Sequence, residues 1–327
     1  MIRVLSLFAG IGGADLGLER AGGFKTVAMC ENNPDRRADL ARLFPDARIY
    51  DDVVTLGAER LSADGIFPDF ICGGFPCQQI SVAGKGEGIG TEENPTDRSG
   101  LWFQFARLIR DTEPSWVVIE NSPRLRRLGL ETILRFLYSC GYDAFWDGIP
   151  ASAVGAYHQR DRLFVIAHRY SDDGGQGRTW RLDTGDTREH KPLGAFSVAN
   201  SDDMRKLQSQ GSVSNLWRRL DDGNKQPIAH GHGTRLAFWE SFRGHLGAEL
   251  ATIKRDNLWN GAQRISEPGM VGTVYDVPAT LDRSGKISKD DRAIWKSRIQ
   301  ALGNSVIPGI FEAIGRAIMH VDGRYSA

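Results

Sequence analysis

Short apolar runs alternate with longer amphipathic stretches through the first half of the chain. Continuous apolar runs bounded by turn residues indicate buried strands, and these lie at residues 4–7, 26–29, 48–50, 69–72, 116–119 and 162–167. Apolar positions at helical spacing predict helices at residues 16–21, 34–44, 101–109 and 128–138. This alternation predicts an α/β fold with a doubly wound, mostly parallel sheet and helices on both faces.

The alternation disappears over residues 170–290, which are rich in Gly, Asp, Ser and Arg. We therefore expect a first domain at residues 1–169, a second, smaller domain at 170–290, and a segment at 291–327 that returns to the first domain. Pro308 begins a last predicted helix, whose apolar residues fall on one face and predict packing against the first domain.

Composition adds limits rather than a function. Lys plus Arg equals Asp plus Glu at 41 each, so the chain has no net positive charge that would indicate a nucleic-acid partner. Positive charge can nevertheless be confined to one cleft. No stretch approaches the ~18 apolar residues of a membrane span, and we expect a cytoplasmic, soluble protein. The 4 cysteines form no C-x-x-C pair and have no histidine at zinc spacing, so we expect reduced thiols and no metal.

A glycine-rich loop carrying Cys77 follows the predicted strand at residues 69–72. Residues 73–81 read Gly-Gly-Phe-Pro-Cys-Gln-Gln-Ile-Ser, in which the glycines permit a sharp turn and the proline stiffens the approach to the thiol. Open α/β sheets bind ligands at the carboxyl ends of their parallel strands, where this loop lies. An isolated thiol is more often a buried cysteine in an ordinary turn.

Polar side chains at two further positions are expected beside Cys77. Glu120 ends the strand at 116–119, and because a buried carboxylate costs stability, it indicates acid–base chemistry on a heterocycle. Arg160 and Arg162 alternate along the last strand and should point the same way. Guanidinium groups suit phosphate and base oxygens, while a salt-bridged surface edge is the alternative for two arginines taken alone.

A second glycine loop, residues 8–13 (Phe-Ala-Gly-Ile-Gly-Gly), follows the first strand and suits a nucleotide-like ligand. The full G-x-G-x-x-G pattern is absent, and tight turns also need glycine. Glu31 ends the second strand about 20 residues on, where a carboxylate can accept bonds from both ribose hydroxyls; a solvated loop carboxylate is an equal alternative. Asp52, after the third strand, can meet an adenine amino group.

Five segments in the expected order resemble the motifs of the DNA (cytosine-5)-methyltransferase family. They are the loop at 8–13, residues 74–78 with Ser81, Glu120–Asn121, residues 160–162, and residues 302–308 (Leu-Gly-Asn-Ser-Val-Ile-Pro). The resemblance covers roughly residues 1–168 and 292–320. Ser6, Ser122 and His158 depart from the family pattern, which often has aspartate, valine and glutamine there.

The resemblance implies a role for each matching residue. Cys77 is the expected nucleophile for carbon 6 of cytosine, Glu120 the group that holds N3, and Arg160 and Arg162 the cations for the thiolate and the base oxygen. Substrate contacts are expected from Gln78, Ser81 and Asn121. S-adenosyl-L-methionine is the implied cofactor, held by Phe8, Gly10, Ile11, Gly12, Gly13, Glu31, Asn32, Asp52, Val53, Gly74, Pro76, Leu101, Asn304 and Ser305.

The implied substrate is double-stranded DNA with the target cytosine flipped out, and residues 170–290 are the expected target-recognition domain. We expect a monomer, with a cognate restriction enzyme of the same system as a candidate partner. One alternative uses the same residues on tRNA, which the long 170–290 segment disfavours. Another is a non-catalytic DNA-binding relative, against which the retention of Cys77, Glu120 and both arginines argues.

Overall fold

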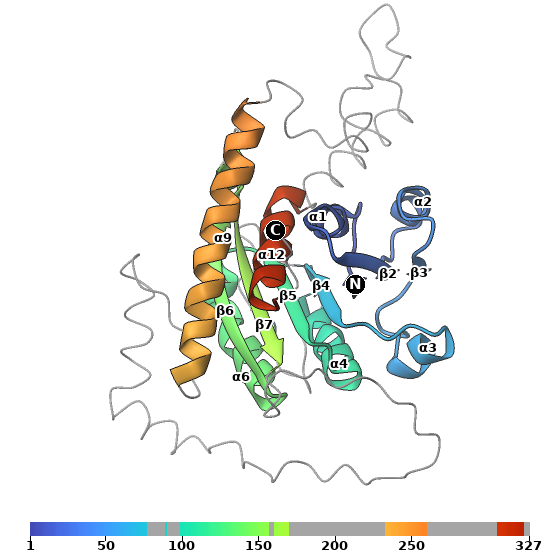
Figure 1. Ribbon diagram of the computed structural model, residues 1–327. Helices are drawn as coiled ribbons and strands as arrows, with labels where there is room; N and C mark the ends of the chain where they lie inside the picture. Colours follow the sequence, from blue (N-terminus) through green and yellow to red (C-terminus); the bar gives the residue numbers. More distant parts are fainter. Residues whose placement is uncertain (77–88, 90–98, 157–159, 170–232, 260–305, 324–327) are drawn as a thin grey trace, which may run out of the picture. The chain divides into compact units, whose positions relative to one another are not determined.

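The computed structural model describes residues 1–76, 89, 99–156, 160–169, 233–259 and 306–323 (Figure 1). One compact unit comprises residues 1–170 and 230–327 and contains every described residue. The other unit, residues 171–229, lies outside the described residues.

A seven-stranded sheet with the order β3-β2-β1-β4-β5-β7-β6 forms the centre of the described unit. Neighbouring strands from β3 to β5 are parallel, and β7 is antiparallel to both β5 and β6. The doubly wound, mostly parallel sheet predicted from the sequence is confirmed. The strands are β1 Ile2–Leu7, β2 Phe24–Cys30, β3 Arg48–Tyr50, β4 Phe70–Gly73, β5 Trp116–Asn121, β6 Tyr142–Pro150 and β7 Asp161–Arg169.

Strand β6 was not predicted. Its sequence contains Asp143, Asp147 and Gly148, which interrupt the apolar run that marks the other strands. The side chain of Asp143 is nevertheless buried, and Phe145 and Trp146 contribute to the core. Pairing with β7 along the whole strand supplies the extended conformation that the residue pattern alone does not indicate.

The helices lie against this sheet in two groups. In one group α4 and α6 meet through Trp102 and Phe136, whose ring centroids are 5.7 Å apart. In the other, α12 crosses the sheet beside α9 and α1 (Figure 1), and Phe311 of α12 packs edge-on against Phe164 of β7. The helices are α1 Gly13–Ala21, α2 Pro34–Leu43, α3 Ala58–Ala63, α4 Trp102–Thr112, α5 Leu125–Leu128, α6 Leu130–Ser139, α9 Gly233–Trp259 and α12 Pro308–Val321, with short 3-10 turns at Ser99–Leu101 and Ala151–Val154.

Helix α9 lies inside the 170–290 segment, which was expected to form a separate domain, and it belongs to the same compact unit as the sheet. Trp239 and Phe242 are buried against Trp116 of β5 and Phe145 of β6. Burial of these large aromatic side chains holds α9 on the sheet. The helix bounds predicted for α4, α6 and α12 agree with the structure to within a few residues.

A buried carboxyl group, Asp15, links the first helix to the first two strands. Its Oδ2 accepts a hydrogen bond from Ser6 Oγ of β1 at 2.9 Å, and its Oδ1 accepts one from Thr26 Oγ1 of β2 at 3.2 Å. Burial raises the pKa of Asp15 to about 7, and the two hydroxyl hydrogen bonds only partly oppose that increase. Asp15 therefore changes charge close to neutral pH.

This arrangement predicts a pH-dependent stability. The pKa of Asp15 is higher in the folded protein than in the unfolded chain, so the folded protein binds more protons between these two values. The stability contributed by protonated Asp15 is therefore lost as pH rises from about 4 to about 7. Asp15→Asn cannot ionise, and its amide can still bond both hydroxyls. Relative to wild type, the variant should gain roughly 2–3 kcal/mol of unfolding free energy between pH 5 and pH 8, measured by urea denaturation. If the unfolding free energies of the variant and wild type differ by the same amount at pH 5 and at pH 8, the raised pKa of Asp15 is contradicted.

Candidate functional site

The loop after β1 leaves open space above Gly10. Phe8, Gly10 and Gly12 have positive φ angles of 55°, 60° and 81°. A Cβ on Gly12 would lie 2.5 Å from the Phe44 ring, so packing against α2 requires glycine there. Among the described residues, the nearest atom to a Cβ on Gly10 would be Phe8 O at 4.0 Å. The loop therefore has room for a ligand over Gly10, at the carboxyl end of the parallel strands.

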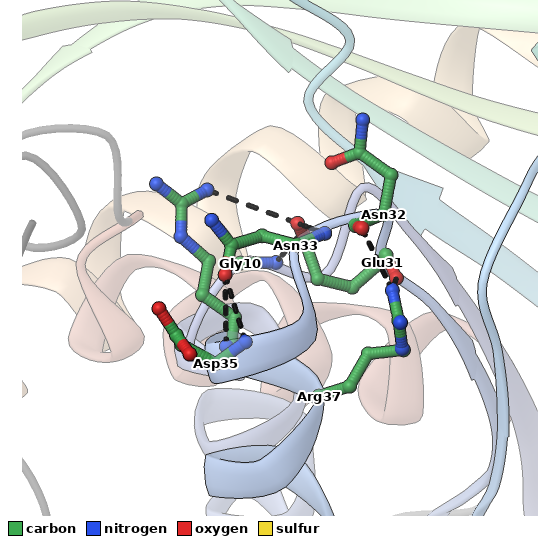
Figure 2. A network of polar contacts seen from close by, with 7 residues as sticks. Gly10, Glu31, Asn32, Asn33, Asp35 and Arg37 are labelled. Carbon is green, nitrogen blue, oxygen red and sulfur yellow. Dashed lines mark hydrogen bonds and ion pairs between the residues drawn. The ribbon is translucent and has the colours of Figure 1, made fainter.

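Glu31 fixes this loop to the end of β2 (Figure 2). Its Oε2 accepts a hydrogen bond from the Gly10 amide and its Oε1 one from the Asn33 amide, both at 2.9 Å. Arg36 Nη1 lies 3.8 Å from Oε1 and compensates the charge of this buried side chain. Each carboxylate oxygen has two acceptor sites, so both retain capacity for ligand hydroxyl groups.

Asn33 and Arg36 were not singled out from the sequence. The Asn33 side chain caps α2 by accepting hydrogen bonds from the amides of Asp35 and Arg36, as Figure 2 shows in part. An Asn-Pro-Asp sequence at a helix start is a recognisable capping signal. The cap orients the first turn of α2, and with it the Asn33 amide that bonds Glu31.

Asp52 lies after β3 with an exposed side chain whose Oδ1 accepts from the Val54 amide at 2.9 Å. Val53 is buried, and its carbonyl accepts a hydrogen bond from Arg107 of α4 at 3.1 Å. Three adjacent strand ends thus offer an open glycine loop and two carboxyl side chains. This donor and acceptor set fits an adenosine-bearing ligand, because carboxylates bind ribose hydroxyls and amino groups.

The Glu120 side chain packs against the backbone of the loop that follows β4. A Cβ on Gly74 would lie 2.5 Å from Glu120 Oε2, so only glycine leaves room for this side chain. Asn121 Nδ2 donates to the carbonyl of Phe75 at 3.0 Å. Both contacts bind the end of β5 to the residues immediately before Cys77, and this is where the sequence placed the site.

The carboxyl group of Glu120 also meets the start of β7. Arg162 Nε lies 2.7 Å from Glu120 Oε1. Burial raises the pKa of Glu120, whereas the charges of Arg162 and Arg160 lower it, and burial has the larger effect. Glu120 consequently holds a proton more readily than an exposed glutamate, which suits a group that donates a hydrogen bond to a base nitrogen.

The expected site residues therefore fall into three sets. The structure brings together Gly74, Pro76, Glu120, Asn121, Arg160 and Arg162 around the β4 and β5 ends. The second set lies at the β1 to β3 ends and the start of α4 and contains Phe8, Gly10, Ile11, Gly12, Gly13, Glu31, Asn32, Asp52, Val53 and Leu101. Outside the described residues lie Cys77, Gln78, Ser81, His158, Asn304 and Ser305.

The described residues contain neither a metal-binding cluster nor a membrane-spanning helix. No group of three or more His, Cys, Asp or Glu side chains there could hold a metal ion. In the same part of the chain, no helix is long and apolar enough to cross a membrane.

Comparison with known protein families shows which family the chain belongs to. The family model described as C-5 cytosine-specific DNA methylase matches residues 2–272. The chain belongs to this family. The resemblance noted in the sequence is confirmed, and the sheet described above agrees with the methyltransferase fold.

Among curated relatives, this chain is 35% identical over 179 residues to the type II methyltransferase M2.BsuMI of Bacillus subtilis, covering 52% of this chain and 43% of that protein. It is 36% identical to the type II methyltransferase M.CviJI of Paramecium bursaria Chlorella virus IL3A, covering 51% of this chain and 43% of that protein. The matched region thus spans about half the length of these relatives or less. A solved DNA modification methyltransferase encoded within a prophage (E. coli) is 27% identical, covering 55% of this chain and 52% of that one, with a TM-score of 0.43.

The close approach of Glu120 to Gly74 yields a stability prediction. Gly74→Ala should displace the Glu120 carboxyl from Arg162 and destabilise the fold by about 1–3 kcal/mol, as overpacking does. Gly244→Ala is the matched control, because no atom of the part of the chain that the structure describes lies within 4 Å of a Cβ there and alanine favours the α9 helix. Urea denaturation of both variants measures the difference. Equal stability of the Gly74→Ala variant and wild type would contradict the described contact.

Proposed function

We propose that this chain transfers the methyl group of S-adenosyl-L-methionine to carbon 5 of a flipped-out cytosine in duplex DNA, at a specific short sequence, through a covalent adduct between Cys77 and carbon 6. The observation that carries this proposal is the buried Glu120 carboxyl, which lies between Arg162 and the backbone three residues before Cys77. Membership of the cytosine-5 DNA methylase family supports the same reaction.

The chemistry explains why these residue types are needed. Carbon 5 of cytosine is a poor nucleophile, and addition of the Cys77 thiolate to carbon 6 moves electron density onto it. A free thiol with a pKa of about 8.5 is only a few per cent ionised at pH 7, so a nearby guanidinium must stabilise the thiolate. Arg160 and Arg162 are the proposed cations, and one of them also binds the base oxygen O2.

Glu120 acts on the opposite edge of the ring. Its raised pKa keeps a proton available for N3, where negative charge develops as the thiolate adds. When bound, S-adenosyl-L-methionine supplies the electrophilic methyl group that carbon 5 accepts. Loss of the proton from carbon 5 to solvent water then allows the Cys77 thiolate to be expelled, which restores the aromatic ring and regenerates the nucleophile.

Binding of the cofactor is assigned to the first three strand ends. The open loop at Gly10, the Glu31 carboxylate and the exposed Asp52 side chain are the proposed adenosine contacts. Asn304 and Ser305 are proposed to close the methionine end. Recognition of the DNA sequence is assigned to the part of 170–290 that precedes α9, and the type II relatives suggest a restriction-modification role.

The nucleophile assignment predicts a complete loss of transfer in one variant. Cys77→Ala should abolish the tritium labelling of duplex DNA by tritiated S-adenosyl-L-methionine, because carbon 5 cannot be activated without the adduct. Cofactor affinity, measured by calorimetry, should stay at the wild-type value. Labelling of DNA by the Cys77→Ala protein would refute the mechanism. Bisulfite sequencing of DNA from cells that express the wild-type chain would report the methylated site, and labelling of tRNA alone would identify the RNA substrate instead.

A second prediction concerns Glu120→Gln, which keeps the shape but cannot deliver a proton to N3. Turnover should fall about 10²–10⁴-fold, the usual effect of losing a general acid, with little change in cofactor affinity. Glu131→Gln on α6 is a matched control because Glu131 is exposed and pairs only with the solvent-facing Arg135 among the ion pairs described. Equal losses of turnover and cofactor affinity in Glu120→Gln would argue against the placement of Glu120 at the base.

A further inference from the structure

A short basic turn follows the Glu120–Asn121 pair. Residues 123–129 read Pro-Arg-Leu-Arg-Arg-Leu-Gly and contain three arginines and no acidic residue, in a chain whose total charge is zero. Residues 125–128 of this turn form α5, with Arg124 at its N-cap; Leu125 is buried, while Arg124 and Arg127 are exposed. Positive charge is thus concentrated at one place beside the proposed active site.

The third arginine of the turn has a structural position. Arg126 is only half-buried and lies over β6, with its Nη2 3.9 Å from Asp147 Oδ1. The same guanidinium would be 3.3 Å from a Cβ on Gly148. Arg126 therefore packs against the sheet, while Arg124 and Arg127 face solvent.

Two anchors hold α5 at the edge of the site. On one side the Leu125 amide donates to Ser122 O at 2.9 Å, which ties the turn to the end of β5. On the other side Ile89 is buried where α5 meets α6: a Cβ on Gly129 would lie 3.1 Å from Ile89 and 3.0 Å from Leu125. Phe75 is thus bonded to Asn121 at the end of β5, and Ile89 packs where α5 meets α6.

The few residues between Glu120 and α5 limit how far α5 can lie from a cytosine bound at Glu120. Arg124 follows Glu120 by four residues, so their Cα atoms lie at most about 14 Å apart. A cytosine whose N3 reaches Glu120 has its sugar and phosphates at the rim of the pocket, since these are the parts that remain joined to the DNA. Arg124 is therefore close to that rim, and Arg127 follows it by three residues, about one helical turn along α5.

We propose that Arg124 and Arg127 bind backbone phosphates of the DNA strand that carries the target cytosine, next to the flipped nucleotide. Guanidinium forks match phosphate oxygens, and phosphate contacts fix the register of a protein on DNA without reading sequence. The inference rests on the proposed function, and it explains how a chain with no net charge can hold a polyanion. Exposed arginines that only solvate the turn are the competing explanation.

The salt dependence of DNA binding distinguishes the two explanations. Each lost phosphate contact lowers the slope of log affinity against log salt by about 0.9. Arg124→Ala combined with Arg127→Ala should therefore lower the slope by about 1.8 and weaken binding at least about tenfold at low salt. Anisotropy with a fluorescent duplex that contains the methylated site gives both values, and unchanged cofactor affinity shows that the variant is folded.

The control removes two cations at the opposite edge of the sheet. Arg20 lies in the last turn of α1 and Lys25 near the start of β2, so Arg20→Ala with Lys25→Ala changes net charge equally but should leave the salt slope at the wild-type value. Arg124→Lys with Arg127→Lys should retain most of the slope, because the charges remain. An α5 alanine variant whose slope equals that of the control overturns the inference. Wild-type protein that neither binds nor methylates duplex DNA would instead refute the proposed function.

Discussion

The direction of one strand determines what surrounds the buried Glu120 carboxyl. A carboxyl group at this depth is costly unless cations or hydrogen bonds compensate it. Because β7 is antiparallel to β5, its first residues lie beside the last residues of β5, and Arg162 meets Glu120 at 2.7 Å. A parallel strand in the same place would begin at the other edge of the sheet, and the carboxyl would have no guanidinium beside it.

The two halves of the site share one construction. In the loop after β1, Glu31 accepts a hydrogen bond from the Gly10 amide. In the loop after β4, Glu120 occupies the space that a side chain on Gly74 would fill. In each case a carboxyl group from the next strand in the sheet reaches the main chain of a glycine loop. At Gly74 the absence of a Cβ permits this approach, because a Cβ there would lie 2.5 Å from Glu120 Oε2, whereas at Gly10 the backbone amide makes the contact.

Strand ends are the part of this molecule that the sequence predicts well, because a buried parallel strand and the polar residue after it are adjacent in the chain. Glu31 and Glu120 were found in this way. Two contacts join residues far apart in sequence, and no local pattern indicates them: Glu120 packs against Gly74, and Ile89 packs beside α5. Strand β6 and helix α9 were missed because polar residues and glycines interrupt their apolar positions, which packing in three dimensions nevertheless buries.

Ser6 shows why a motif compared position by position can mislead. The family often has an aspartate at this position, and the sequence alone indicates a lost carboxyl group. The structure has Asp15 of α1 with its carboxyl 2.9 Å from Ser6 Oγ, so an acidic group occupies the neighbouring space from a different element. The replacement is not equivalent, because burial raises the pKa of Asp15 to about 7. A carboxyl group that is partly protonated at neutral pH, bonded to both β1 and β2, supports the glycine loop with less charge than an ionised aspartate would bring.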